Sequence, residues 1–254
     1  MSDSSPRPIT ACVLIIGNEI LSGRTQDVNL KHIALTLGRW GIQVAQARVV
    51  PDLEAVVVAA LNETRRQFDY VFTTGGIGPT HDDITADCVA KAFGVDLVIS
   101  DEIAEVIQRR SAPPDVMASR MRMARVPRGC ELIDNLTGGP QGFRIDNVFV
   151  MAGIPGVMQA MLKSLEGKLQ SGPVVRSVSV TAYLGESQIA GPLRSIQERY
   201  PTADLGSYPF FRNDRYGTTL VMRGADTATL DAMLAEVEDA IRNGGEVPQD
   251  VQRG

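Results

Sequence analysis

Apolar runs and helix-spaced apolar positions alternate along the first two thirds of the chain. Residues 11–16 form a short apolar run that ends at Gly17, which is typical of a central strand buried on both faces, and residues 43–50 and 70–74 predict two further strands. Apolar residues at helical spacing lie between these runs: Leu30, Ile33, Ala34 and Leu37, then Leu53, Val56, Val57, Ala60 and Leu61. This alternation predicts a three-layer α/β/α domain with a mostly parallel sheet.

Polar and proline residues mark where several elements begin. Asp52 is expected to cap the second helix, and Ser100 is expected to cap a later one. An irregular stretch is expected at residues 113–114. A helix is expected to open at Pro155, because a first helical turn does not need the N–H that proline lacks. Short strands are expected at residues 142–145 and 148–151.

The pattern changes after Gly172. The elements expected beyond it are a strand at 174–184, a helix at 186–200, strands at 204–208 and 218–223, and a helix at 226–242. We therefore expect an α/β domain over residues 10–171 and a small α+β domain over residues 172–254, which would serve as an interface or a lid. Residues 1–9 are mostly polar and are expected to be disordered.

The composition favours a small-molecule ligand over a nucleic acid or a membrane. The 254 residues carry a net charge of −5, whereas general nucleic-acid or anionic-membrane binders normally carry a basic surplus. The small domain has no Gly-x-x-Gly loop of the KH type, and no P-loop sequence occurs. No signal peptide or membrane-spanning apolar run is found, so we expect a cytoplasmic protein. Three separated cysteines and two histidines form no zinc motif, so any metal is expected to be a hard, oxygen-bound cation.

The segment 73–85, with the sequence TTGGIGPTHDDIT, carries the strongest functional signal. Gly75, Gly76 and Gly78 follow an expected strand, and glycine lets backbone N–H groups approach a ligand without a Cβ in the way. A helix is expected just after, and its first N–H groups favour an anion. The segment therefore predicts a phosphate-binding turn. Because Glu19 follows the first strand at the same edge of the sheet, both loops are expected to face one pocket.

Asp82 and Asp83 are the candidate metal-binding and catalytic residues. Two adjacent carboxylates repel each other and a phosphate, and a bridging Mg²⁺ would remove that repulsion. One of the two would ligate the metal, and the other would ligate it or orient water. The alternative is that one of them caps the following helix. Glu19 is either a further ligand or a polar capping residue, and His81 is either an acid–base group or, as we favour, an exposed loop residue.

A local excess of arginine lies between residues 109 and 128 of this acidic chain. Its members are Arg109, Arg110, Arg120, Arg122, Arg125 and Arg128. They could reach a second phosphate, but a solvated or subunit-contacting surface is the favoured interpretation.

These motifs resemble the molybdopterin-binding family, in particular its branch of competence/damage-inducible CinA-like proteins. The resemblance is carried by residues 17–23, 26–29, 75–85 and 135–143. It implies an α/β sandwich followed by a small KH-like domain. The positions that it implies as functional are Gly75, Gly76, Gly78 and Thr80 around a phosphate, Asp82 or Asp83 on a divalent metal, and Glu19 and Asn29 in the pocket lining. Pro140–Phe143 departs from the family's usual Ala-Pro-Gly-Phe, so contacts of that loop are not carried over.

The resemblance implies a metal-dependent nucleotide pyrophosphatase acting on ADP-ribose- or FAD-like compounds, as is associated with the CinA-like branch and with a related domain of eukaryotic FAD synthases. The alternatives are molybdopterin binding or adenylyl transfer in molybdenum cofactor biosynthesis, and a non-catalytic ligand-binding module. The family also implies a homo-oligomer, either dimer or trimer, with residues 151–165 as a candidate contact surface. Longer relatives carry an amidohydrolase domain, which is expected to be absent here.

Overall fold

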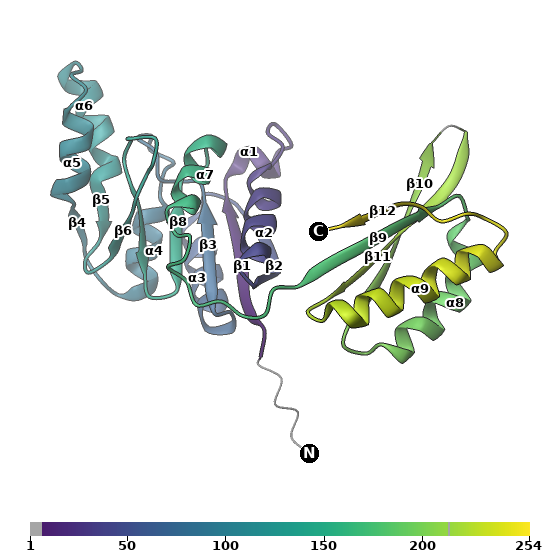
Figure 1. Ribbon diagram of the computed structural model, residues 1–254. Helices are drawn as coiled ribbons and strands as arrows, with labels where there is room; N and C mark the ends of the chain where they lie inside the picture. The colour runs from purple at the N-terminus through teal and green to yellow at the C-terminus, as the bar shows by residue number, and fades with distance from the viewer. Residues whose placement is uncertain (1–6, 213) are drawn as a thin grey trace. The chain divides into compact units, whose positions relative to one another are not determined.

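The computed structural model describes residues 7–212 and 214–254, and the chain divides into two compact units between Gly172 and Pro173 (Figure 1). Disorder was expected for residues 1–9, of which residues 1–6 lie outside the described residues. Ile9 already begins the first strand.

The first unit is built on a six-stranded sheet in the order β2-β1-β3-β8-β7-β6. Its strands are β1 Ile9–Ile16, β2 Ile42–Val50, β3 Tyr70–Thr74, β6 Glu131–Ile133, β7 Gly142–Ile145 and β8 Val148–Met151. The first four strands of that order run parallel, and β7 is antiparallel to both of its neighbours, β8 and β6. The predicted mostly parallel α/β sheet is confirmed.

Helices cover both faces of this sheet (Figure 1). They are α1 Asn18–Leu21, α2 Asn29–Arg39, α3 Glu54–Gln67, α4 Thr85–Phe93 and α7 Pro155–Lys163. Helices α2 and α7 share one apolar core with Val13 and Phe72, and α3 and α4 share another with Leu14 and Val71. Successive residues of β1 therefore enter opposite cores, which explains its unbroken apolar run. Burial of each large apolar side chain contributes about 1.5–3 kcal/mol.

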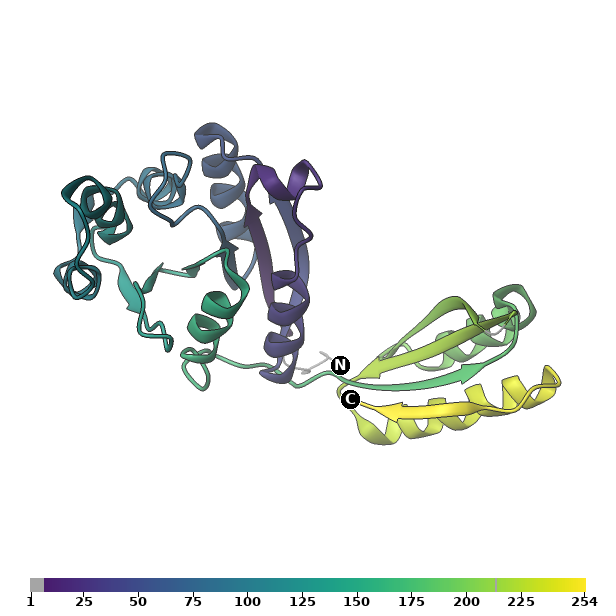
Figure 2. The ribbon, with the colours of Figure 1, turned by 90° about the horizontal axis from the view of Figure 1, so that it is seen from above.

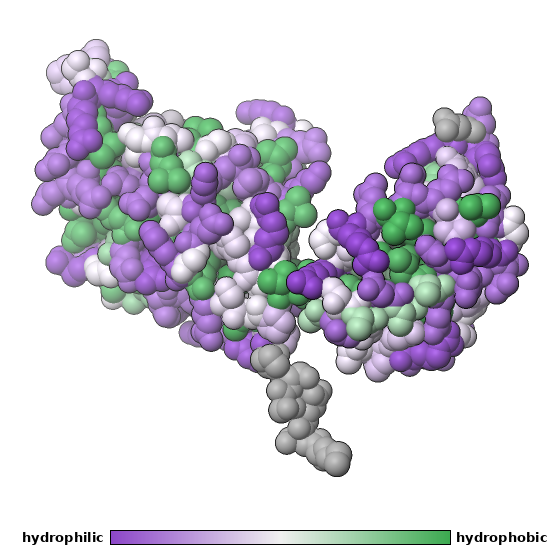
Figure 3. Space-filling view, viewed as in Figure 1, coloured by the Kyte–Doolittle hydropathy of each residue, from purple (hydrophilic) through white to green (hydrophobic). Residues whose placement is uncertain are grey.

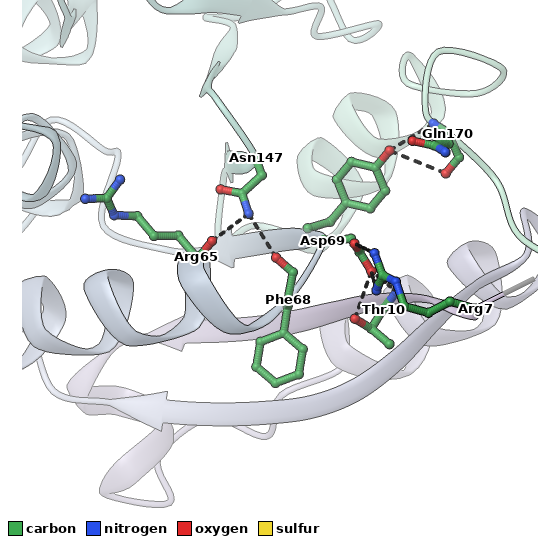
Figure 4. A network of polar contacts seen from close by, with 8 residues as sticks. Arg7, Thr10, Arg65, Phe68, Asp69, Asn147 and Gln170 are labelled. Carbon is green, nitrogen blue, oxygen red and sulfur yellow. Dashed lines mark hydrogen bonds and ion pairs between the residues drawn. The ribbon is translucent and has the colours of Figure 1, made fainter.

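Polar contacts join the amino ends of the central strands (Figure 4). The Asp69 carboxylate accepts hydrogen bonds from the Arg7 guanidinium at 2.5 and 2.9 Å and from the Thr10 backbone N–H at 2.8 Å. The Asn147 amide donates to the carbonyl oxygens of Arg65 and Phe68 at 2.9 and 3.0 Å. These contacts hold the turn before β3 against β1 and β8, at the sheet edge opposite the carboxyl ends of the strands.

A lobe formed by residues 97–127 projects beside this sheet (Figure 1). It contains β4 Leu97–Ile99, α5 Asp101–Gln108, α6 Pro114–Met121, the 3-10 turn η1 Arg122–Ala124 and β5 Arg125–Pro127, with β4 and β5 antiparallel. Ser100 caps α5 as predicted, with its hydroxyl accepting from the Ile103 N–H at 3.3 Å. Where an irregular stretch was expected, Pro113 is the N-cap of α6 and Pro114 opens it. As at Pro155, proline is tolerated at Pro114 because a first helical turn does not need the N–H that proline lacks.

The second unit has the element order β-α-β-β-α-β. Its elements are β9 Arg176–Ala182, α8 Glu186–Arg199, β10 Asp204–Arg212, β11 Arg215–Gly224, α9 Thr227–Asn243 and β12 Gln249–Arg253. The sheet order β10-β11-β9-β12 with antiparallel neighbours is the split βαβ arrangement. Both helices lie behind the sheet in Figure 2 and share one apolar core with it. The predicted small α+β domain is confirmed.

The described surface is mostly hydrophilic on the face that Figure 3 shows, and its apolar residues form small, separate groups. Among the described residues, no helix has the length and apolarity needed to cross a membrane.

Candidate functional site

A pocket lies at the carboxyl ends of β1, β3 and β8. Its volume is about 670 Å³, and its lining includes Gly17 and Glu19 after β1, most of the turn 75–83 after β3, and Gly153 after β8. Parallel α/β sheets bind ligands at this edge. The prediction that the Glu19 loop and the Gly75 turn face one pocket is confirmed. His81 is exposed and is not part of the lining.

Gly75 and Gly76 shape the turn after β3. Their φ angles are 99° and 67°, and a Cβ at either position would lie 2.2 Å from the Ile16 carbonyl oxygen or the Thr85 Oγ1, respectively. Thr85, the first residue of α4, donates its hydroxyl to the Gly75 carbonyl at 2.9 Å and its N–H to the Gly76 carbonyl at 3.0 Å. The turn is therefore pinned to both β1 and α4, and only glycine fits at these two positions.

The turn offers unused N–H groups to the pocket. In the described parts of the chain, the backbone N–H groups of Gly76, Ile77 and Gly78 have no hydrogen-bond acceptor, and all three residues line the pocket. The turn leads directly into α4, whose N-terminus carries partial positive charge. This arrangement suits an anionic group such as a phosphate.

Asp83 is bound by Thr80, whereas Asp82 is left free. The Thr80 N–H and hydroxyl donate to Asp83 Oδ2 at 2.8 and 2.5 Å, so both donors of Thr80 are used within the turn. Because a hydroxyl has one hydrogen and the 2.5 Å contact gives it to Asp83, Asp82 keeps both carboxylate oxygens available. Neither aspartate caps α4, whose N-cap is Ile84 without a side-chain hydrogen bond.

The pocket lining includes the carboxylates of three candidate residues. No group of three or more His, Cys, Asp or Glu side chains in the described residues forms a metal-binding cluster. Mg²⁺ needs only one or two carboxylates, because waters and substrate phosphate oxygens complete its shell. Asp82, Asp83 and Glu19 all line the pocket. The Glu19 carboxylate lies close over Gly17, where a Cβ would be 2.5 Å from its Oε2, and it caps no helix among the described residues.

Asn29 supports the pocket and does not line it. Its side chain is 5% exposed, and its Nδ2 donates to the Gly153 carbonyl at 2.8 Å. Its Oδ1 is buried and has no partner among the described residues. Asn29 was expected to line the pocket, but its role in the structure is to hold the loop after β8, and it is Gly153 in that loop that lines the pocket.

Two further polar residues reach the pocket in ways that local sequence did not indicate. Asp52 was expected to cap α3, but the N-cap is Leu53, and Asp52 instead accepts from the Asn18 N–H at 2.8 Å. Asn135 holds its own loop, since its Oδ1 accepts from the Thr137 hydroxyl at 2.7 Å and its Nδ2 donates to the Pro140 carbonyl at 2.9 Å. Both residues line the pocket.

Half of the arginine cluster faces the same pocket. Arg110, Arg122 and Arg125 are lining residues, and Arg125 pairs with Asp87 at 2.5 Å. Arg110 is exposed and Arg122 and Arg125 are half-buried, so a solvated surface and a place in the pocket lining hold together for these residues. The density of arginine in an acidic chain was the available signal in the sequence, but the fold of residues 97–127 decides which arginines line the pocket.

The cysteines supply no nucleophile to this site. Burial raises the pKa of Cys12 to about 11 and that of Cys88 to about 12, and it also raises the pKa of Cys130. Their thiols stay protonated at neutral pH, so the chemistry available in the pocket is that of carboxylates, backbone N–H groups and guanidinium groups.

Comparison with known proteins identifies relatives of both units. Residues 12–170 match the family model described as "Probable molybdopterin binding domain", and residues 174–250 match "FAD synthase, middle domain". A crystal structure of a CinA protein with unknown function from Thermoplasma acidophilum is 34% identical with a TM-score of 0.58, and the match covers 63% of this chain and 96% of that one.

Full-length relatives differ in size. "Protein Ta0487" of Thermoplasma acidophilum is 30% identical over 93% of this chain and 94% of its own length. A "CinA-like protein" of Citrifermentans bemidjiense is 36% identical over 63% of this chain but only 41% of its own length. A "Putative competence-damage inducible protein" of Clostridium botulinum is 31% identical over 77% of this chain and 50% of its own length. The chain thus spans half or less of these two bacterial relatives. The matched family model and these similarities show that the chain belongs to the molybdopterin-binding-domain family, in its CinA-like branch.

Proposed function

We propose that this protein is a metal-dependent nucleotide pyrophosphatase acting on ADP-ribose- or FAD-like compounds. One observation carries the proposal: unpartnered N–H groups of the turn Gly76–Gly78 and the carboxylates of Asp82 and Asp83 line a single pocket. An anion-binding turn beside a carboxylate pair is the donor set that a phosphate and a divalent cation need together.

Each part of the site has a task in this proposal. The turn and the α4 N-terminus hold one phosphate group and stabilise the charge that develops on its oxygens during attack by water. Asp82 and Asp83 hold a divalent cation, Mg²⁺ or a similar ion, which when bound neutralises phosphate charge and lowers the pKa of bound water. Asn29 and Thr85 keep the walls of the pocket in place through Gly153 and Gly75.

The pocket and the family models support a nucleotide-sized ligand. A volume of about 670 Å³ lies in the range of small-molecule sites. The match of the second unit to the middle domain of FAD synthase favours a dinucleotide-like compound. Molybdopterin binding, with or without adenylyl transfer, is the second candidate, because the description of the first unit's family names that ligand.

Product analysis tests the proposal. The full chain is incubated with ADP-ribose or FAD and Mg²⁺ or Mn²⁺, and nucleotides are separated by chromatography. We expect AMP to appear with metal, to disappear when EDTA is added, and to be absent for Asp82→Asn. Stable retention of molybdopterin without AMP formation from either compound would instead favour the binding function.

We also propose that the protein assembles as a dimer or trimer. The contact surface suggested for residues 151–165 needs revision, because Met158, Met161 and Leu162 are buried in the protein's own core. Ile154 is 68% exposed and is the large apolar side chain of this segment that remains available for contact. Light scattering coupled to size-exclusion chromatography would give the oligomeric state.

A further inference from the structure

Arg110 and Arg122 bring positive charge to the pocket outside the ion pairs of the described residues. Both line the pocket, and neither forms an ion pair with any residue that the structure describes. Arg122 Nε is buried and has no acceptor among the described residues. A buried donor without an acceptor is unfavourable unless a ligand supplies the acceptor, so Arg122 points to an anionic guest.

The lobe that carries these arginines is held against the phosphate-binding side of the domain. Arg110 follows the end of α5, and Arg122 opens η1. The lobe is attached to α4 by the ion pair between Arg125 and Asp87, and it is attached to the loop before β7 by the hydrogen bond that Gln141 donates to Glu102 at 2.8 Å. Because α4 begins directly after the glycine turn, the turn and the arginines form two walls of one pocket.

We infer that Arg110 and Arg122 form a second phosphate subsite, so that the pocket takes a diphosphate with an organic group on each phosphate. This inference rests on the proposed function and specifies its substrate class. One phosphate binds to the N–H groups of the turn Gly76–Gly78, and the other binds to the two guanidinium groups. A ligand with a single phosphate, such as a pterin monophosphate, would leave the arginines without a partner.

The subsite has a defined part in the reaction. The oxygen of water forms a bond to the phosphorus on the glycine turn, and the bond from that phosphorus to the bridging oxygen breaks. The bridging oxygen leaves with the electron pair as part of the second phosphate, and the two protons of water pass to solvent. Guanidinium groups suit the leaving phosphate because they stay charged and bind phosphate oxygens in pairs.

Two probes test the subsite, one with two phosphorus groups and one that lacks the second phosphorus group together with its ribose. The α,β-methylene analogue of ADP-ribose has a CH₂ group in place of the bridging oxygen and cannot be hydrolysed at that position, and AMP serves as the single-phosphate probe. Both are titrated calorimetrically, with Mg²⁺, into the full chain and into Arg110→Gln and Arg122→Gln. The matched control is Arg109→Gln, since Arg109 is exposed, adjacent in sequence and outside the pocket lining.

We expect each pocket variant to weaken binding of the analogue at least tenfold, equivalent to about 1.4 kcal/mol, and to change AMP binding less than twofold. The control variant Arg109→Gln should leave the affinities for both the analogue and AMP unchanged. Arg122→Lys keeps the charge and should retain part of the affinity, and circular dichroism with thermal melting establishes that each variant is folded. Arg110 is exposed, so its variant separates binding from folding.

Three results would overturn the subsite: an equal loss of affinity for both probes, no loss for either, or failure of the unmutated chain to prefer the analogue over AMP. A failure of the proposed function would give a different set of results from a failure of the subsite. If ADP-ribose is not cleaved but the arginine-dependent preference for the analogue holds, the pyrophosphatase proposal is wrong and the subsite stands.

Discussion

Thr80 donates both its backbone N–H and its hydroxyl to the same oxygen of Asp83, at 2.8 and 2.5 Å. The contact gives the two adjacent aspartates different surroundings. Asp83 is part of the internal structure of the turn, while Asp82 is exposed and offers its carboxylate to the pocket. The two residues should therefore respond differently to substitution.

Asp82→Asn should remove metal affinity without changing stability. Because Asp82 is exposed and no side chain of the turn depends on it, the free energy of unfolding should change by less than about 0.5 kcal/mol. Asp83→Ala should weaken metal binding and also lower stability by about 1–2 kcal/mol, since Thr80 loses its acceptor. Mn²⁺ titration and urea unfolding measure the two effects. Unchanged Mn²⁺ affinity in Asp82→Asn would show that Asp82 is not a ligand.

Gly76→Ala should disrupt the turn more than a positive φ alone can explain. Gly76 and Gly94 have nearly equal φ angles of 67° and 66°, but a Cβ at Gly76 would lie 2.2 Å from Thr85 Oγ1, whereas one at Gly94 has no atom within 4 Å. Gly94→Ala should cost about 1–2 kcal/mol, the penalty of the left-handed conformation. Gly76→Ala should cost more and should abolish phosphate-ligand binding. Urea unfolding and calorimetric titration compare the two variants, and equal losses in both assays would contradict the close contact.

Asn29→Ala should lower stability and ligand affinity together. The substitution removes the donor to the Gly153 carbonyl, and because Gly153 is exposed and water can replace that donor, the loss should be about 0.5–1.5 kcal/mol. Because Gly153 lines the pocket and a Cβ there would lie 3.3 Å from Gly75 Cα, a shift of this loop reaches the glycine turn. Urea unfolding measures the stability, and titration with the ADP-ribose analogue measures the affinity. Reduced stability with full affinity would mean that Asn29 has no effect on the pocket.

Asp69 should make stability depend on pH in the acid range. Hydrogen bonds from Arg7 lower the pKa of Asp69 to about 2, below its ordinary value of 3.8. A carboxyl whose folded pKa is lowered stabilises the protein above its unfolded pKa and loses that contribution as pH falls towards the folded value. Asp69→Asn should therefore lower the free energy of unfolding by about 1 kcal/mol at pH 7, and this difference should shrink between pH 4 and pH 2. A difference that stays constant over this range would rule out the ionised carboxylate as its source.

Local patterns in the sequence determined most of the helices and strands. The unbroken apolar run of β1 predicted a strand with two covered faces, and the third strand was predicted with the bounds that the structure has, Tyr70–Thr74. The glycine turn and the carboxyl edge of the sheet also followed from sequence, because glycine content and the strand–helix order are local properties. Helix α6 was missed although Pro113 and Pro114 carried the signal for a helix start.

Which side chains share the pocket depends on contacts between distant parts of the chain. Asp52 binds the Asn18 N–H instead of capping α3, and Asn29 holds Gly153, which lies 124 residues away in the chain. The place of Arg110 and Arg122 in the pocket lining depends on how the lobe of residues 97–127 packs against α4. Propensity and periodicity describe contacts between near neighbours in sequence, whereas these partners meet because the sheet brings the ends of separate strands to one edge. Local sequence was thus enough to predict the glycine turn for which we propose the first phosphate, whereas the packing of distant segments sets which side chains lie opposite it.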